Sequence, residues 1–346
     1  MKRLIMIFIL LMTLAVPASA LEIEAPKAPD SAADLMPTET ASFGESLLEL
    51  LQNVVKKIRP DIAEATRASL SVVSAAMMVS LLKSFSERAF SAADLAGTVM
   101  IAASLFLSLN SLIRLGADTV TELSEYGKLL LPVMTAAMAA QGAGTASAAL
   151  YTGTAVFDMV LSSLIANLLV PMVYLYLALA AANSATGEEL LKKMRDFVKW
   201  LVSWCLKTIL TVFTTYMSIT GVVSGATDAA VLKAAKVTIS SVVPVVGGIL
   251  SDASEAVLVS AGLMKNAAGI YGILVILAVF LEPFLRIGIH YMIMKVTAAV
   301  CGLFGTKRIT DLIEDFSTAM GLLLAMTGSA CLLLLISTVC FLKGVG

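Results

Sequence analysis

A glutamate, an arginine and a histidine recur at intervals of four residues inside an apolar run. They are Glu282, Arg286 and His290, within residues 270–294, and Pro283 follows the glutamate. This spacing puts all three on one helix face, and glutamate four residues before arginine is the favourable order for an ion pair. Ionisable groups within membrane segments are costly, so they pair or face an aqueous path. One interpretation is a polar lining or proton-coupled site. The alternative, which we favour, is an ion pair near the cytoplasmic end of a span, with Arg286 reaching the headgroups and Pro283 kinking the helix.

A second group of polar residues interrupts the apolar sequence between residues 224 and 268. Its charges recur at largely helical spacing on both sides of a proline and two glycines, which predicts two amphipathic helices around a break. Such an element is either a solvated outer loop lying on the membrane, or a broken or re-entrant helix that lines a passage or docks a partner. The residues that we nominate are Asp228, Lys233, Lys236, Pro244, Gly247, Gly248, Asp252 and Glu255.

Signatures of enzymatic chemistry are missing from the sequence. It contains no phosphate-binding GxxxxGK[ST] loop and no HExxH zinc pattern, and its single histidine cannot supply a conventional metal cluster. The four cysteines lack the short paired spacing of metal sites and redox dithiols, so we interpret them as small buried hydrophobes. We therefore expect no catalytic residue, no cofactor and no metal, and a protein that is not an enzyme. If the protein's work needs energy, another protein supplies it.

The composition predicts a polytopic membrane protein. Of the 346 residues, 59% are hydrophobic and only 14% are charged, and the mean hydropathy is +0.93. Ordinary globular domains carry roughly a quarter charged residues. A net charge of -1 leaves no broad basic surface that could neutralise a run of phosphates, so we expect membrane lipid and no nucleic acid as a partner.

The first 67 residues divide into three predicted segments. Two basic residues, a short apolar run and small residues up to Ala20 predict a signal peptide over residues 1–20, cleaved after Ala20, with an uncleaved anchor as the alternative. Residues 21–43 are acidic and proline-rich, which predicts a flexible extracytoplasmic leader. Residues 44–67 predict an amphipathic helix on the membrane or on a partner, which Pro60 interrupts.

Residues 68–346 form the predicted multi-span membrane domain. The fold class is all-α, a membrane helical bundle of about seven spans with one interrupted or re-entrant element. The apolar runs cover residues 68–82, 95–113, 129–150, 154–182, 200–223, 270–294 and 318–342. Lys and Arg clusters predict that residues 184–199 and the region around 295–308 are cytoplasmic. An outside start then needs an odd number of crossings before residue 184, whereas four runs precede it, so one run is a half-span or does not cross.

The interrupted segment also carries a family resemblance. Residues 218–272 read SITGVVSGATDAAVLKAAKVTISSVVPVVGGILSDASEAVLVSAGLMKNAAGIYG. This stretch resembles the stage III sporulation protein AE family. The likeness continues more loosely through the signal-like start, through KLLLPVMTAAMAAQGAGTASAALY at residues 128–151, and through the closing GLLLAMTGSACLLLLISTVCFLKG.

The resemblance implies a polytopic subunit of the export-like channel apparatus encoded by the stage III sporulation A operon. That apparatus lies in the mother-cell membrane around the forespore and is required for forespore development. The implied partners are other stage III sporulation A proteins, among them a cytoplasmic ATPase and ring-forming subunits between the two membranes. The family supplies no catalytic residues to transfer. An independent secondary transporter or permease is the alternative, although we find no convincing inverted repeat.

Overall fold

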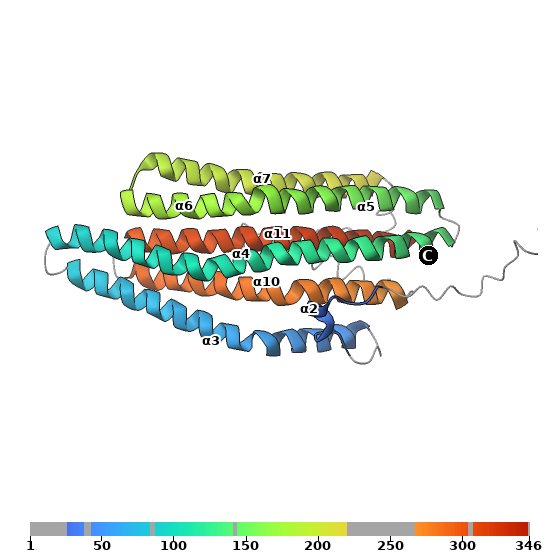
Figure 1. Ribbon diagram of the computed structural model, residues 1–346, viewed down its shortest axis with the longest axis horizontal. Helices are drawn as coiled ribbons and strands as arrows, with labels where there is room; N and C mark the ends of the chain where they lie inside the picture. Colours follow the sequence, from blue (N-terminus) through green and yellow to red (C-terminus); the bar gives the residue numbers. More distant parts are fainter. Residues whose placement is uncertain are drawn as a thin grey trace, which may run out of the picture.

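The protein folds as a bundle of long helices. The structure, a computed structural model, describes residues 26–37, 43–83, 87–140, 144–219, 267–303 and 307–344. All regular elements in these ranges are helical, and the long helices run side by side in alternating directions (Figure 1). The elements are α2 (Asp30–Ala33), α3 (Phe43–Lys83), α4 (Glu87–Ala140), α5 (Gly144–Leu164), η1 (Ile165–Leu169), α6 (Val170–Thr186), α7 (Glu189–Ile219), α10 (Ala267–Gly302) and α11 (Lys307–Gly344). The all-α fold class predicted from the sequence is confirmed.

Six helical segments in the described ranges are long and apolar enough to cross a membrane. They are Phe43–Leu81, Leu95–Ala137, Ser147–Thr186, Glu189–Ser218, Gly269–Gly302 and Lys307–Leu342. The sequence predicts about seven, because the run 129–150 counts as a span of its own. In the structure α4 ends at Ala140 and α5 begins at Gly144, so this run is divided between two helices. Three crossings then precede the connection at residues 187–188, which is the odd number that the charge distribution requires.

The interruption that the sequence predicts at Pro60 is absent from α3. Helix α3 continues through Pro60 and joins the amphipathic segment to the following apolar run in one helix of 41 residues. A proline in a helix interior costs about 3 kcal/mol, because it removes a backbone hydrogen bond and crowds the preceding turn. Ion pairs to α10 lie on both sides of it, at Lys57 and at Asp61, and stabilise the continuous helix.

The interruption that the structure describes lies in the third crossing. Helices α5 and α6 join through η1, one turn of π-helix, and Pro171 follows directly in the first turn of α6. A π-turn accommodates one extra residue within a helix and is a frequent feature of functional sites. The predicted break at Pro244, Gly247 and Gly248 lies outside the described residues.

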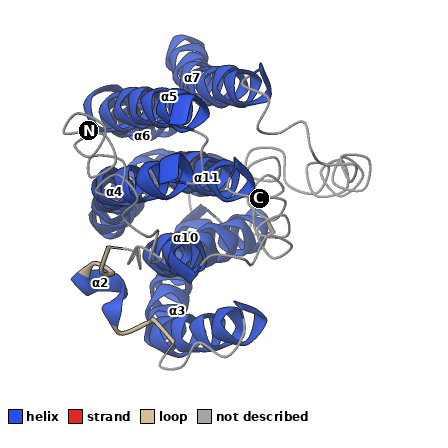
Figure 2. Ribbon diagram, turned by 90° about the vertical axis from the view of Figure 1, so that its right-hand side faces the viewer, coloured by secondary structure: helices blue, strands red, loops and turns tan. Residues whose placement is uncertain are grey.

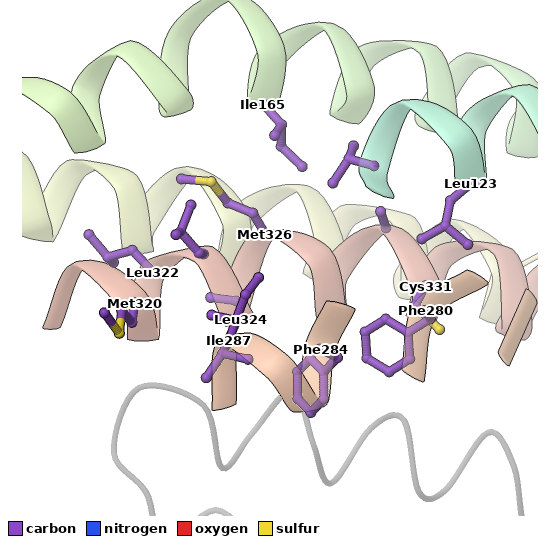
Figure 3. Packing of buried hydrophobic residues seen from close by; sticks show 14 of the residues in the cluster. Leu123, Ile165, Phe280, Phe284, Ile287, Met320, Leu322, Leu324, Met326 and Cys331 are labelled. Atoms are coloured by element: carbon purple, nitrogen blue, oxygen red, sulfur yellow. The ribbon is translucent and has the colours of Figure 1, made fainter. Parts of the chain in front are cut away.

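Helix α11 forms the centre of the bundle. Its most apolar window is 94% buried, against 61% for α10 and 22% for α3 and for α7. Viewed along the bundle, α11 and α4 lie between α5, α6 and α7 on one side and α10 and α3 on the other (Figure 2). Leu123 of α4, Ile165 of η1, Phe284 of α10 and Leu324 of α11 belong to the resulting core (Figure 3). The outer helices α3 and α7 therefore offer the largest surfaces to lipid or to partners.

The hydroxyl groups buried on α11 satisfy their hydrogen bonds largely within that helix. Ser329, Ser337 and Thr338 each donate to the backbone carbonyl four residues earlier, at 2.6–2.8 Å. Ser337 also accepts a hydrogen bond from Thr154 of α5 at 3.0 Å. Because these groups need no water, α11 can be enclosed on all sides at membrane depth.

A substitution at Gly153 tests the close approach of α5 and α7. A Cβ at this position would lie 2.2 Å from the Tyr216 ring, whose hydroxyl donates to the Ala149 carbonyl at 2.9 Å. We expect Gly153→Leu to lower the free energy of unfolding by about 1–3 kcal/mol, the usual cost of overpacking. Thermal unfolding of the purified protein in detergent measures the effect. Tyr216→Ala in the same chain should recover part of the loss, whereas Gly44→Ala, which meets no atom within 4 Å, should not destabilise. Unchanged stability in Gly153→Leu would contradict the packing.

Candidate functional site: charged helix faces at the height of the membrane

Glu282 and Arg286 pair with α3 and not with each other. The Glu282 carboxylate lies 2.8 Å from the Lys57 ammonium, and the Arg286 guanidinium lies 3.0 Å from the Asp61 carboxylate. His290 bonds through Nδ1 to the Arg286 carbonyl at 2.9 Å. The predicted pair along one helix is therefore corrected to two ion pairs between helices. Glu282 and Arg286 thus each pair with an opposite charge on α3, and the two ion pairs stabilise the contact between α3 and α10.

The partners on α3 repeat the spacing found on α10. Lys57 and Asp61 are four residues apart, as are Glu282 and Arg286, and the signs run basic then acidic on α3 and acidic then basic on α10. Because α3 and α10 run in the same direction, this order brings opposite charges together twice. The sequence analysis predicted an amphipathic helix over residues 44–67 but nominated neither Lys57 nor Asp61. The matching spacing with opposite signs is the signal that could have found the contact.

A polar pocket lies beside these ion pairs, between α3, α4, α10 and α11. Its volume is about 90 Å³, and its polar lining comes from Asp61, Glu64, Arg286 and His290 together with two serines of α4. The Nε atom of Arg286 is buried and has no hydrogen-bond partner among the described residues. A polar cavity of this size accommodates a few water molecules. The structure thus brings Arg286 and His290 to one polar site, while Glu282 is not among its lining residues.

A second buried cluster ties α7 and α6 to α11. Arg195 donates to Asp315 at 2.5 Å, and the Tyr176 hydroxyl donates to the other oxygen of the same carboxylate at 3.0 Å. Only 11% of the Arg195 and Asp315 side chains is exposed. The sequence analysis counted Arg195 as a cytoplasmic loop charge and did not nominate Asp315 or Tyr176. No local pattern links these three residues, because their contact exists only after α6, α7 and α11 have packed.

The outward faces of α3 and α4 carry charges at mid-height of the apolar core. Asp61 of α3 pairs with α10, and a Cβ at Gly116 of α4 would lie 3.6 Å from Ile287 of α10 and 3.6 Å from Thr327 of α11. Position 327 is near the middle of the apolar run 318–342. The charged side chains exposed on these outward faces around this height are Lys56, Arg59 and Arg67 on α3 and Arg114 and Asp118 on α4.

The apolar parts of α3 and α4 are displaced along the bundle from those of α10 and α11. Residues 68–82 and 95–113 form a hairpin, in which Gly97 lies against Val79. Figure 1 shows α4 starting well beyond the adjacent ends of α6 and α11. Large apolar side chains exposed on this hairpin are Leu70, Met78, Leu81, Met100 and Leu107. Along α3 and α4, the exposed apolar surface of the hairpin is therefore followed by the exposed charged surface described above.

The nominated residues between positions 224 and 268 lie outside the described residues. These are Asp228, Lys233, Lys236, Pro244, Gly247, Gly248, Asp252 and Glu255. Within the described ranges no three His, Cys, Asp or Glu side chains come together in a way that could hold a metal ion. The described site is thus one of paired charges and polar surface.

Breaking one ion pair at the α3–α10 contact tests its contribution. Arg286→Met leaves Asp61, whose side chain is only 16% exposed, without its counter-ion. We expect a loss of about 1–3 kcal/mol in unfolding free energy, below the full cost of a completely buried pair because Arg286 is partly exposed. The charge swap Asp61→Arg/Arg286→Asp should recover most of it, as a double-mutant cycle in detergent would show. Lys193→Ala, which removes an exposed pair at 3.9 Å, is the neutral control. Equal losses in the single and swapped variants would contradict a direct pair.

Comparison with known proteins agrees with the resemblance seen in the sequence. The family model for stage III sporulation protein AE matches residues 33–344. A curated relative, stage III sporulation protein AE of Bacillus subtilis (strain 168), is 24% identical over 220 residues, which cover 62% of this chain and 55% of the relative. The matched part thus spans about half the length of that relative. No solved structure matches the chain. Because the family model covers nearly the whole chain, this multi-pass membrane protein belongs to the stage III sporulation protein AE family.

Proposed function

We propose that this chain is the polytopic membrane subunit of the stage III sporulation A channel apparatus, which links the mother cell to the forespore. It resides in the mother-cell membrane around the forespore and is required for forespore development. Membership of the family and six helices able to cross a membrane support the proposal. One structural observation carries it, namely the charged faces of α3 and α4 at the height of the apolar core.

Lipid alone cannot cover this molecule. A bilayer centred on the apolar parts of α10 and α11 puts the exposed charges of α3 and α4 into hydrocarbon, at about 2.5–3.5 kcal/mol for each lysine, arginine or aspartate. A bilayer moved onto the α3–α4 hairpin instead leaves apolar surface of α5 and α7 outside the core, which is about 30 Å thick. Either placement requires protein or water on one flank. A subunit of a larger membrane assembly meets this requirement.

The opposite flank of the bundle suits lipid. Phe197, Trp200 and Trp204 of α7 are 51–58% exposed, with successive ring centroids 5.8 and 6.1 Å apart. They follow the basic start of α7, where Lys192, Lys193 and Lys199 lie. Aromatic rings beside basic residues are typical of the membrane–water interface on the cytoplasmic side. The chain therefore has one lipid flank and one flank for the assembly.

The proposal assigns no bond-making step to this chain. ATP hydrolysis belongs to a companion ATPase on the cytoplasmic side, and ring-forming partners extend the passage between the two membranes. The signal peptide over residues 1–20 and the outer position of residues 224–268 are parts of the same proposal. The pocket beside Arg286 favours an alternative, an independent secondary transporter, because such proteins bind solutes near the membrane midplane.

Deletion of the gene tests the proposal in a sporulating host. We expect vegetative growth to be unchanged and the yield of heat-resistant spores to fall nearly to zero, because forespores would not complete development. Complementation with the tagged wild-type chain is the control, and purification in mild detergent should recover the companion ATPase and ring-forming subunits with it. Normal spore yield from the deletion strain would overturn the sporulation role. A chain that restores sporulation yet purifies without those partners would favour the transporter.

A further inference from the structure

The charged faces of α3 and α4 match one another in height and in sign. The ion pair of Asp61 with α10 and the contact of Gly116 with Ile287 bring residues 61 and 116 to about the same height. The helices are antiparallel, so each step forward along α3 corresponds to one step back along α4, as the contact of Val79 with Gly97 also indicates. Each residue rises about 1.5 Å, so heights can be compared closely.

Two pairs of opposite charge lie at equal height by this relation. Arg59 is level with Asp118, and Lys56 is level with Glu122 to within about one residue. The two α3 residues are basic and the two α4 residues at the same heights are acidic.

These charges do not pair with each other within one chain. Lys56, Arg59 and Asp118 are exposed, and none of them forms an ion pair with another described residue. Helix α10 lies between the two faces, and Ser31 of α2 donates a hydrogen bond to the half-buried Glu122 on the same side (Figure 2). Each face is therefore available to another molecule.

We propose that a second copy of this chain docks here, with the α3 face of one copy on the α4 face of the next. Copies inserted in one membrane share their orientation, so their symmetry axis is normal to the membrane and rotation about it preserves height. Such a rotation brings the two basic residues of α3 against the two acidic residues of α4. The two surfaces differ, so the contact is heterologous, and a series of such contacts closes into a ring. Pairing removes the exposed charges from lipid at membrane depth.

This inference deepens the proposed function by naming what covers its charged flank, and it rests on that proposal for its membrane assembly. Cross-linking in membranes tests the ring without any measurement of sporulation. Spore yield tests the function without any measurement of the ring. Failure of the proposed ring is therefore distinguishable from failure of the proposed sporulation function.

The experiment joins two differently tagged full-length copies in the same membrane. One copy carries Arg59→Cys and the other Asp118→Cys, and the four native cysteines, Cys205, Cys301, Cys331 and Cys340, are replaced by alanine in both. A short bis-maleimide reagent should join the two tags in one product. Val156→Cys and Val212→Cys, exposed on α5 and α7, form the matched control pair and should give no joined product.

Charge reversal tests whether the joined product reflects specific docking, because a product from random collisions between copies would not depend on these charges. Lys56→Glu in the copy with Arg59→Cys should reduce the joined product at least about tenfold, because like charges then face each other. Glu122→Lys in the copy with Asp118→Cys should restore it. Absence of any product that joins the two tags would overturn the proposal. So would efficient labelling of Arg59→Cys by an impermeant thiol reagent without any joined product, because the face would then line water.

Discussion

A charged side chain at the middle of a bilayer must pair with an opposite charge or reach water, and this constraint organises the whole molecule. On the inner side of α3, Lys57 and Asp61 meet Glu282 and Arg286 of α10 at 2.8 and 3.0 Å. These contacts set the height of α3 against the rest of the bundle. They also carry α3 through Pro60, since the charges on both sides of the proline are held by the same neighbour.

The fixed register has consequences on the outer side of the same helices. Because Lys57 and Asp61 face inward, the adjacent residues Lys56 and Arg59 face outward at nearly the same height. The α4 face carries Asp118 level with Arg59. A single chain leaves these groups exposed where its centre is most apolar, so the register that stabilises one chain also exposes the charges on which the proposed docking of a second copy rests.

The inner and outer helices therefore have different tasks. Helix α11 is enclosed and satisfies its buried hydroxyls largely within itself, which makes it a scaffold against which the other helices pack. The cluster of Arg195, Asp315 and Tyr176 fixes α6 and α7 to that scaffold at the end near residues 187–188. Exposed aromatic rings on α7 and exposed charges on α3 and α4 then lie on different flanks of the bundle. In the proposed channel subunit, the first flank faces lipid and the second faces the assembly.

By itself the sequence determined the all-α membrane class, the family, and the single α10 face that carries Glu282, Arg286 and His290, because hydropathy and helical spacing are local properties. It could not determine the partners of those residues. Lys57 is 225 positions away from Glu282, and only the parallel packing of α3 on α10 brings them together. It also treated residues 129–150 as one span, because an apolar run does not show where one helix ends and the next begins. Tertiary structure decided the pairing, the register and the charged flank, because each depends on the relative heights of helices that are distant in the chain.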